Sequence, residues 1–149
     1  MAKRYRFGLQ KLLEIREDKE EESKRLFTES KKAKLKTEQD LKNLNDSFNK
    51  YKGIKPGEDV IYQKVKRNYL IALESSIRDK ERELKIKEVE LESRRLDLEN
   101  KQIDRKTVSK LKEKQYNSYV SEQNRIEQLN NDEFALYAYI RKTKGGENL

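Results

Sequence analysis

A single interruption in an otherwise helix-forming sequence limits this chain to very few folds. The interruption is Gly53-Ile54-Lys55-Pro56-Gly57-Glu58-Asp59, which holds the one Pro of the chain and two of its five Gly. Pro56 has no amide proton and disfavours helical geometry in the residue before it, and Gly53 and Gly57 permit positive φ. Lys, Glu and Arg, which favour helix, dominate both flanks. The sequence therefore predicts two helices joined by one turn.

We expect one domain over residues 1–149. It comprises a first helix over about 4–52, a turn at 53–59 with Asp59 as N-cap, a second helix over about 60–142 and a short flexible tail at 143–149. At 1.5 Å per residue the helices would measure roughly 70 and 125 Å. Charged residues make up 43% of the chain and hydrophobic residues 33%, so it has too little apolar surface for a compact core. An extended helical assembly that buries one narrow stripe fits this composition.

Both expected helices carry apolar residues at coiled-coil spacing. The second has a seven-residue repeat, Leu70, Ile77, Leu84, Leu91 and Leu98, and the first has Leu41, Leu44, Phe48 and Tyr51. A short turn makes the helices antiparallel, with the numbers of facing residues adding to about 111 and Phe48 opposite Tyr62 and Val65. The fold class is thus an all-α antiparallel coiled-coil hairpin with a longer second helix. We expect the end at the turn to be packed most firmly, because the alternate seam positions of the second helix after Leu73 become Lys80, Lys87, Arg94 and Lys101.

A second stripe on the longer helix points away from this seam. It consists of Ile86, Val89, Leu96 and Ile103. The sequence leaves two explanations open: a wider seam or local register shift, or a face that binds a partner.

The second expected helix is longer than the first and extends beyond its end. By the expected pairing, about 30 residues beyond position 108 have no partner, which corresponds to roughly 45 Å of helix. One face of this overhang is apolar and consists of Tyr119, Ile126, Leu129, Leu136 and Ile140. An exposed apolar stripe on a lone helix usually has a partner. The candidates are a second copy of the chain, a groove in another protein, or, least suited to its mixed charge, a membrane surface.

Basic residues gather where the start of the first helix is expected to lie beside residues 105–114 of the second, at the point where the paired helices become a single helix. We call this group the basic collar; it comprises Lys3, Arg4, Arg6, Arg105, Lys106, Lys110, Lys112 and Lys114. The chain has a formal net charge of +8, which suits either nucleic acid or an acidic protein. Asp and Glu interrupt every basic stretch, so we favour an acidic protein surface and keep a nucleic-acid-binding or purely structural coiled coil as the alternative.

The sequence lacks the residues on which most catalytic and metal sites depend. It has no Cys, His or Trp, which excludes thiolate chemistry and the usual zinc sites, and it has no P-loop or dinucleotide motif. We therefore expect no enzyme activity, no cofactor and no metal. No apolar run approaches the length of a membrane span, and the N-terminus resembles no secretory signal. We expect a cytoplasmic protein with no direct membrane insertion.

The two ends of the chain resemble those of the FliJ family of flagellar type III export proteins. The opening run from Tyr5 to Glu17, with Leu9-Gln10-Lys11-Leu12-Leu13 at its centre, is similar to the family's start. Asn131-Asp132-Glu133-Phe134-Ala135 is similar to the Asp-Glu-x-Ala near the end of many members. The order of these motifs, the length and the unequal helices also match, so the resemblance covers essentially the whole chain.

The resemblance implies a non-enzymatic stalk in the pore of the hexameric flagellar export ATPase. Such proteins promote assembly of that ring and link it to the membrane export gate and to export chaperones. Carried over, the termini end would contact the ring and the hairpin tip would contact the gate, at the inner-membrane export apparatus. Tip residues that match family positions are Leu44, Tyr51, Tyr69 and Leu73, with Ser76 and Lys80 less similar. The equivalent stalk of a virulence-type secretion system is the closest alternative.

Overall fold

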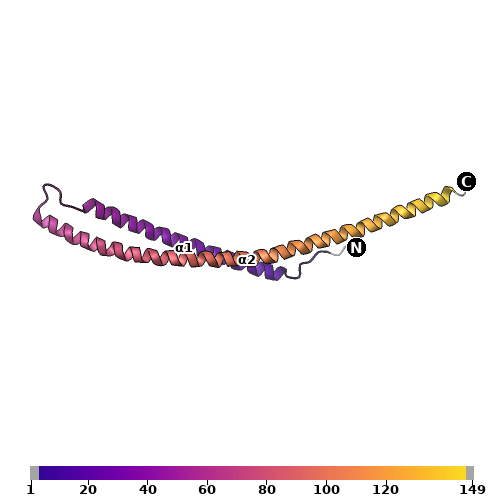
Figure 1. The fold of residues 1–149 in the computed structure, drawn as a ribbon, viewed down its shortest axis with the longest axis horizontal. Helices are drawn as coiled ribbons and strands as arrows, with labels where there is room; N and C mark the ends of the chain where they lie inside the picture. Colours follow the sequence, from indigo (N-terminus) through magenta and orange to yellow (C-terminus); the bar gives the residue numbers. More distant parts are fainter. Residues whose placement is uncertain (1–3, 147–149) are drawn as a thin grey trace. The chain divides into compact units, whose positions relative to one another are not determined.

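The computed structural model describes residues 4–146, which form two helices (Figure 1). Helix α1 spans Gln10–Tyr51 and helix α2 spans Val60–Gly146. The connecting segment contains Gly53 and Gly57, each with a φ of +84°, a conformation that side chains with a Cβ rarely adopt. The carbonyl of Asp59 accepts the first helical hydrogen bond of α2, from Gln63 N at 2.9 Å. Asp59 therefore occupies the predicted N-cap position.

The helices pack against each other, and the chain divides into two compact units. The turn unit comprises residues 18–103. The termini unit comprises residues 4–17 and 104–146. Each unit contains a stretch of both helices and is described separately.

In the turn unit, side chains at alternating spacings of three and four residues face the seam. On α2 these include Leu73, which is 6% exposed, and the half-buried Leu84, Leu91 and Leu98. The predicted heptad is thus the packed face of α2. Lys80 and Lys87 occupy seam positions too, with side chains about one-third exposed. Their stems cover the seam while their ammonium groups reach Asp40 and Glu90.

The register of this seam differs from the predicted one. Ser23 donates a hydrogen bond to Asp97, Asp40 pairs with Lys80, and the rings of Tyr51 and Tyr69 lie 5.6 Å apart. In every pair the two residue numbers add to 120, as 23 and 97 do, so the expectation of about 111 was wrong. Tyr62 and Val65, predicted to face Phe48, are 49% and 61% exposed.

The connecting segment explains the shift. Nine residues of α2, 60–68, precede Tyr69, the residue that faces the last residue of α1. At 1.5 Å per residue this offset is about 13 Å. Residues 52–59 cover it by running back along α2, where Glu58 reaches Lys66 at 2.8 Å. A turn that joined the two helix ends directly would have given the predicted register. The path of residues 52–59 along α2 shifts the register instead.

The seam of the turn unit is polar over much of α1. Glu20, Ser23 and Thr37 are buried, at 7%, 3% and 4% exposed. The Thr37 hydroxyl donates to the carbonyl of Ala33, whereas the buried Ser30 Oγ has no hydrogen-bond partner. Such positions contribute little hydrophobic free energy.

The termini unit holds a cluster of buried apolar residues. Phe7, Leu13 and Val108 are 8%, 4% and 4% exposed, and Tyr5 and Leu12 pack against them. The expectation that the turn end is the more firmly packed was therefore wrong. The sequence pattern missed this cluster because residues 4–9 were expected to extend the first helix, whereas α1 begins only at Gln10.

Candidate functional surfaces

A non-helical N-terminal strap, residues 4–9, lies against α2 in the termini unit. The Tyr5 hydroxyl donates to the carbonyl oxygen of Lys112 at 3.2 Å. Its ring centroid lies 5.2 Å from that of Tyr116 and 5.4 Å from that of Tyr119, a spacing at which aromatic pairs attract one another. Tyr119, predicted as part of the exposed overhang, is therefore partly covered by the strap.

The strap brings two residues of the predicted basic collar beside α2. Arg4 and Arg6 are exposed and flank the docked Tyr5. On α2, Lys106 and Lys110 are exposed. Lys3 lies outside the described residues.

Two other residues of the collar are less available to a partner. The Lys112 ammonium donates to Gln10 Oε1 at 2.7 Å, so it joins the two helices of the unit. Arg105 is half-buried and already has an interaction partner. The exposed collar residues are thus Arg4, Arg6, Lys106, Lys110 and Lys114, and charge reversal of the first four tests an external acidic contact.

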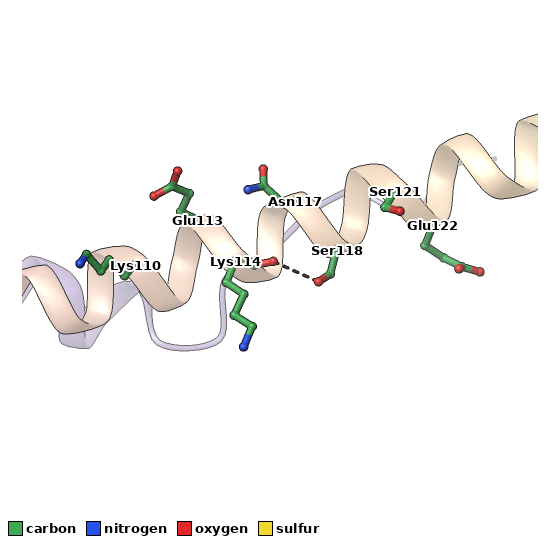
Figure 2. Close-up of a pocket in the computed structure, with 7 residues that line it drawn as sticks. All are labelled: Lys110, Glu113, Lys114, Asn117, Ser118, Ser121 and Glu122. Carbon is green, nitrogen blue, oxygen red and sulfur yellow. Dashed lines mark hydrogen bonds between the residues drawn. The ribbon is translucent and has the colours of Figure 1, made fainter.

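One face of α2 next to the collar has balanced charge. Figure 2 shows Lys110, Glu113, Lys114, Asn117, Ser118, Ser121 and Glu122 around a surface depression of about 600 Å³. All seven side chains come from one helix, and the Ser118 hydroxyl donates to the Lys114 carbonyl at 3.0 Å. Because a single helix lines this depression, it cannot exclude water from a bound substrate as an enzyme active site does.

The C-terminal segment, residues 124–146, is exposed along its whole length. It includes four of the predicted contact residues: Ile126, Leu129, Leu136 and Ile140, which are 37–57% exposed. Phe134, Tyr137 and Tyr139 are more exposed still, at 59–69%. Seven large apolar side chains within 23 residues make this an exposed apolar surface of the kind that usually binds a partner.

In the turn unit, some of the residues predicted to contact the gate are exposed and others are buried in the seam. Tyr69 is 45% exposed and Ser76 is exposed. Leu73 is 6% exposed, and Leu44 and Tyr51 are half-buried at seam positions. Tyr69 and Ser76 are therefore accessible to a partner, whereas Leu73 supports the seam beneath them.

The connecting segment forms an apolar groove on α2 that the sequence reading missed. The groove has a volume of about 430 Å³, and its apolar lining includes Ile54, Val60 and Leu70. Glu58 and Lys66 meet at its edge, with side chains only 12% and 8% exposed. The hydrogen bond from Lys66 holds the pKa of Glu58 below its ordinary value. Ile54 and Val60 were the available signal, whereas Leu70 was assigned to the seam.

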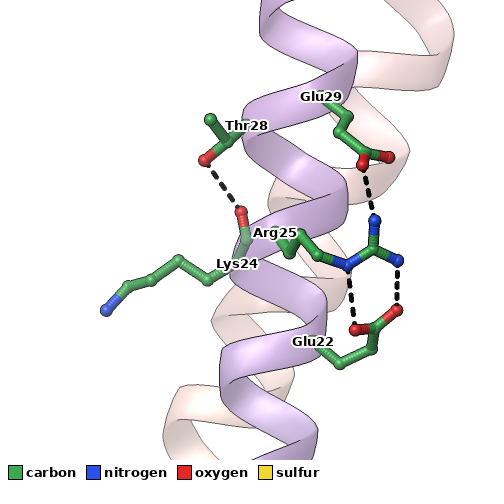
Figure 3. Close-up of polar contacts among 5 residues, drawn as sticks. All are labelled: Glu22, Lys24, Arg25, Thr28 and Glu29. Atoms are coloured by element: carbon green, nitrogen blue, oxygen red, sulfur yellow. Dashed lines mark hydrogen bonds and ion pairs between the residues drawn. The ribbon is translucent and has the colours of Figure 1, made fainter.

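Several of the remaining charged residues form solvated ion pairs within a single helix. In Figure 3, Arg25 lies between Glu22 and Glu29, with Arg25 Nε 3.0 Å from Glu22 Oε2. The hydrogen bond from Arg25 lowers the pKa of Glu22. Arg95 and Arg125 bind Glu92 and Glu122 in the same i,i+3 geometry. Exposed pairs of this kind contribute little to stability.

Neither a membrane span nor a metal site was found in the described part of the chain. Among residues 4–146 no helix combines the length and the apolar character needed to cross a bilayer. The same residues contain no group of three or more acidic, His or Cys side chains that could hold a metal ion.

The fold and these surfaces define a class: an antiparallel two-helix coiled coil whose second helix is the longer, with exposed basic and apolar surfaces. A family model described as "Flagellar FliJ protein" matches residues 5–144. The chain therefore belongs to the FliJ family, a structural component of flagellar export. Searches of curated proteins and of solved structures gave no match.

Proposed function

We propose that this chain is the stalk of the flagellar export ATPase, promoting assembly of the hexameric ring and coupling it to the export gate and export chaperones. Membership of the FliJ family over almost the whole chain carries the proposal. In this role the chain works at the cytoplasmic side of the inner-membrane export apparatus.

The termini unit has the chemistry for the ATPase contact. Arg4, Arg6, Lys106 and Lys110 present exposed positive charge suited to an acidic pore lining. The C-terminal segment adds a helix with exposed aliphatic and aromatic side chains on several sides, which a surrounding ring would cover. Charge steers the encounter, and apolar burial supplies most of the affinity.

The turn unit has the chemistry for the gate contact. Tyr69 offers an aromatic ring already positioned by Tyr51, and the groove lined by Ile54, Val60 and Leu70 lies on the same stretch of α2. Aromatic side chains held in place lose little entropy on binding. The chaperone contact follows from family membership and is assigned to no residue.

Charge reversal in the collar tests the ATPase contact. We expect the change of Arg4, Arg6, Lys106 and Lys110 to Glu to weaken binding to the purified ATPase at least tenfold, because attraction becomes repulsion. Binding is measured by titration calorimetry and activity by stimulation of ATP hydrolysis. Circular dichroism should show unchanged helicity, since all four side chains are exposed.

A matched variant separates the site from net charge. Lys31, Lys32, Lys36 and Lys42 are exposed on α1 in the turn unit, and reversing them to Glu changes the total charge equally. This control should retain most of the binding. Equal losses in both variants, or none in the first, would contradict a role for the collar.

Substitution of Tyr69 with Ala tests the gate contact. The ring is 45% exposed, so we expect a several-fold loss of binding to the cytoplasmic region of the gate protein with a fall in Tm of only a few degrees. Surface plasmon resonance and thermal denaturation measure the two effects. Ile71→Ala, at a residue 56% exposed two positions away, is the control. Unchanged gate binding by Tyr69→Ala would show that the contact lies elsewhere.

A further inference from the structure

The groove beside the connecting segment combines an apolar lining with basic side chains. Its apolar lining includes the half-buried Leu70 and the more accessible Ile54 and Val60, which are 79% and 63% exposed. Lys64 and Arg67 also line the groove and are exposed. They are three residues apart on α2, so they lie side by side on the helix surface.

The acidic residue that lines the groove is neutralised within the chain. Lys66 Nζ lies 2.8 Å from Glu58 Oε1 and 3.2 Å from Glu58 Oε2, and the two side chains are 8% and 12% exposed. Separating a buried pair leaves an uncompensated buried charge, which is strongly unfavourable, so an incoming ligand does not open it. The pair also holds the connecting segment against α2, so the groove is formed before a ligand arrives.

The exposed basic residues of the groove, by contrast, are unmatched. Neither Lys64 nor Arg67 forms a hydrogen bond or ion pair with another residue that the structure describes. Outside the pair of Glu58 and Lys66, residues 52–67 contain four bases and one acid: Lys52, Lys55, Lys64, Arg67 and Asp59. Positive potential of this kind repels basic partners and attracts acidic ones.

The shape of the groove favours a protein segment as its occupant. Sites for small molecules enclose most of the ligand surface, whereas Ile54 and Val60 leave this groove open to water. A lipid bilayer would cover the projecting Ile54 and Val60, but a single side chain of a protein segment also reaches the half-buried Leu70.

We propose that this groove binds an acidic segment of another protein through one aliphatic or aromatic side chain. That side chain contacts Ile54, Val60 and Leu70, and the carboxylates of the segment pair with Lys64 and Arg67. The assignment of the segment to the export gate rests on the proposed function, whereas the chemistry of the groove does not.

A short designed peptide with Asp and Glu on both sides of a central Leu is the probe. Its fluorescence anisotropy is measured with the full-length protein. One comparison peptide replaces the Leu with Ser, and another keeps the Leu and replaces the acids with Lys. We expect the acidic Leu peptide to bind about tenfold more tightly than either. The protein's net charge of +8 attracts the acidic Ser peptide equally, so the difference between these two reports the apolar contact.

Charge reversal locates the basic side of the site. Lys64→Glu with Arg67→Glu should weaken binding of the acidic Leu peptide about tenfold and leave helicity unchanged, because both side chains are exposed. Arg78→Glu with Lys85→Glu changes the total charge equally at exposed positions of the same helix and should retain binding.

A polar substitution locates the apolar side. Ile54→Gln should weaken binding of the same peptide several-fold, because it removes apolar contact area at a residue outside both helices. Ile86→Gln, at a residue of α2 that is 58% exposed, is the control and should bind normally.

Three outcomes overturn the proposal. Equal binding of the acidic Leu and Ser peptides would remove the apolar contact, and equal losses in the two charge-reversed variants would remove the basic one. Binding to phosphatidylglycerol vesicles that Lys64→Glu with Arg67→Glu abolishes would identify a lipid surface as the occupant.

Binding to the gate protein separates this inference from the proposed function. If Tyr69→Ala loses gate binding while Lys64→Glu with Arg67→Glu retains it, the groove is not the site although the gate contact stands. If the groove binds the acidic Leu peptide and the chain does not bind the gate, the gate assignment fails and the chemistry of the groove stands.

Discussion

Replacing Leu13 with Ala is expected to lower the free energy of unfolding by about 3 kcal/mol, the usual cost of truncating a buried Leu. Leu13 is 4% exposed and packs with Phe7 and Val108 in the termini unit. The cluster has few members, so neighbouring side chains have little means of filling the space. Urea denaturation followed by circular dichroism measures the change, which corresponds to more than a hundredfold in the unfolding equilibrium.

The same substitution at an exposed leucine of α1 provides the comparison. Leu35 is 67% exposed, and Leu35→Ala should change the free energy of unfolding by less than about 0.5 kcal/mol. If the two variants have equal stability, the strap does not form the packed cluster. Tyrosine fluorescence adds a local readout, because Tyr5 stacks beside Tyr116 and Tyr119 and should become more solvated in Leu13→Ala.

The helices and their packed faces were readable from the sequence. Only Gly53–Asp59 combines helix breakers, and the structure has its turn there. The heptad through Leu84 and Leu91 identified the inner face of α2, including Lys80 and Lys87 at its polar positions. Periodicity predicts such faces well because burial repeats with the helix itself.

The register between the two helices could not be predicted from the sequence in the same way. Apolar residues recur every few positions on both helices, so registers nine residues apart both bring apolar side chains together. The choice depends on the path of residues 52–59, which run beside the start of α2 and place Glu58 against Lys66. Contacts such as the one between Glu58 and Lys66 leave no periodic pattern in the sequence, so periodicity could not predict the register.

The surfaces were predicted only in part. Basic residues near the N-terminus and in residues 105–114 were predicted to form one cluster, but the docking of Tyr5 and the hydrogen bond from Lys112 to Gln10 depend on the non-helical strap. Gly8, just before α1, was the available signal. Leu73 had two predicted roles, a seam position and a family contact position, and its burial at 6% exposed agrees with the seam.

A chain that ends at Gln123 is expected to fold normally and lose ATPase binding. Residues 124–146 are exposed throughout, so their removal should shift Tm by no more than a few degrees. Under the proposed function they supply the apolar surface that the ring buries, and their loss should weaken binding at least a hundredfold. Titration calorimetry with the ATPase and thermal denaturation of the truncated chain give the two quantities.

Substitutions in the full-length chain decide whether apolar contact or mere length is responsible. Gln has nearly the helix propensity of Leu, so changing Ile126, Leu129, Leu136 and Ile140 to Gln removes apolar surface while keeping the helix. This variant should approach the truncated chain in its loss of binding. Gln at the polar positions Asn124, Glu127, Asn130 and Asn131 of the same segment should retain binding. If the first variant binds as the intact chain does, the apolar side chains are not the contact. If the truncated chain itself binds normally, the collar alone holds the ATPase, because each aliphatic residue that the ring would cover in this segment is then absent.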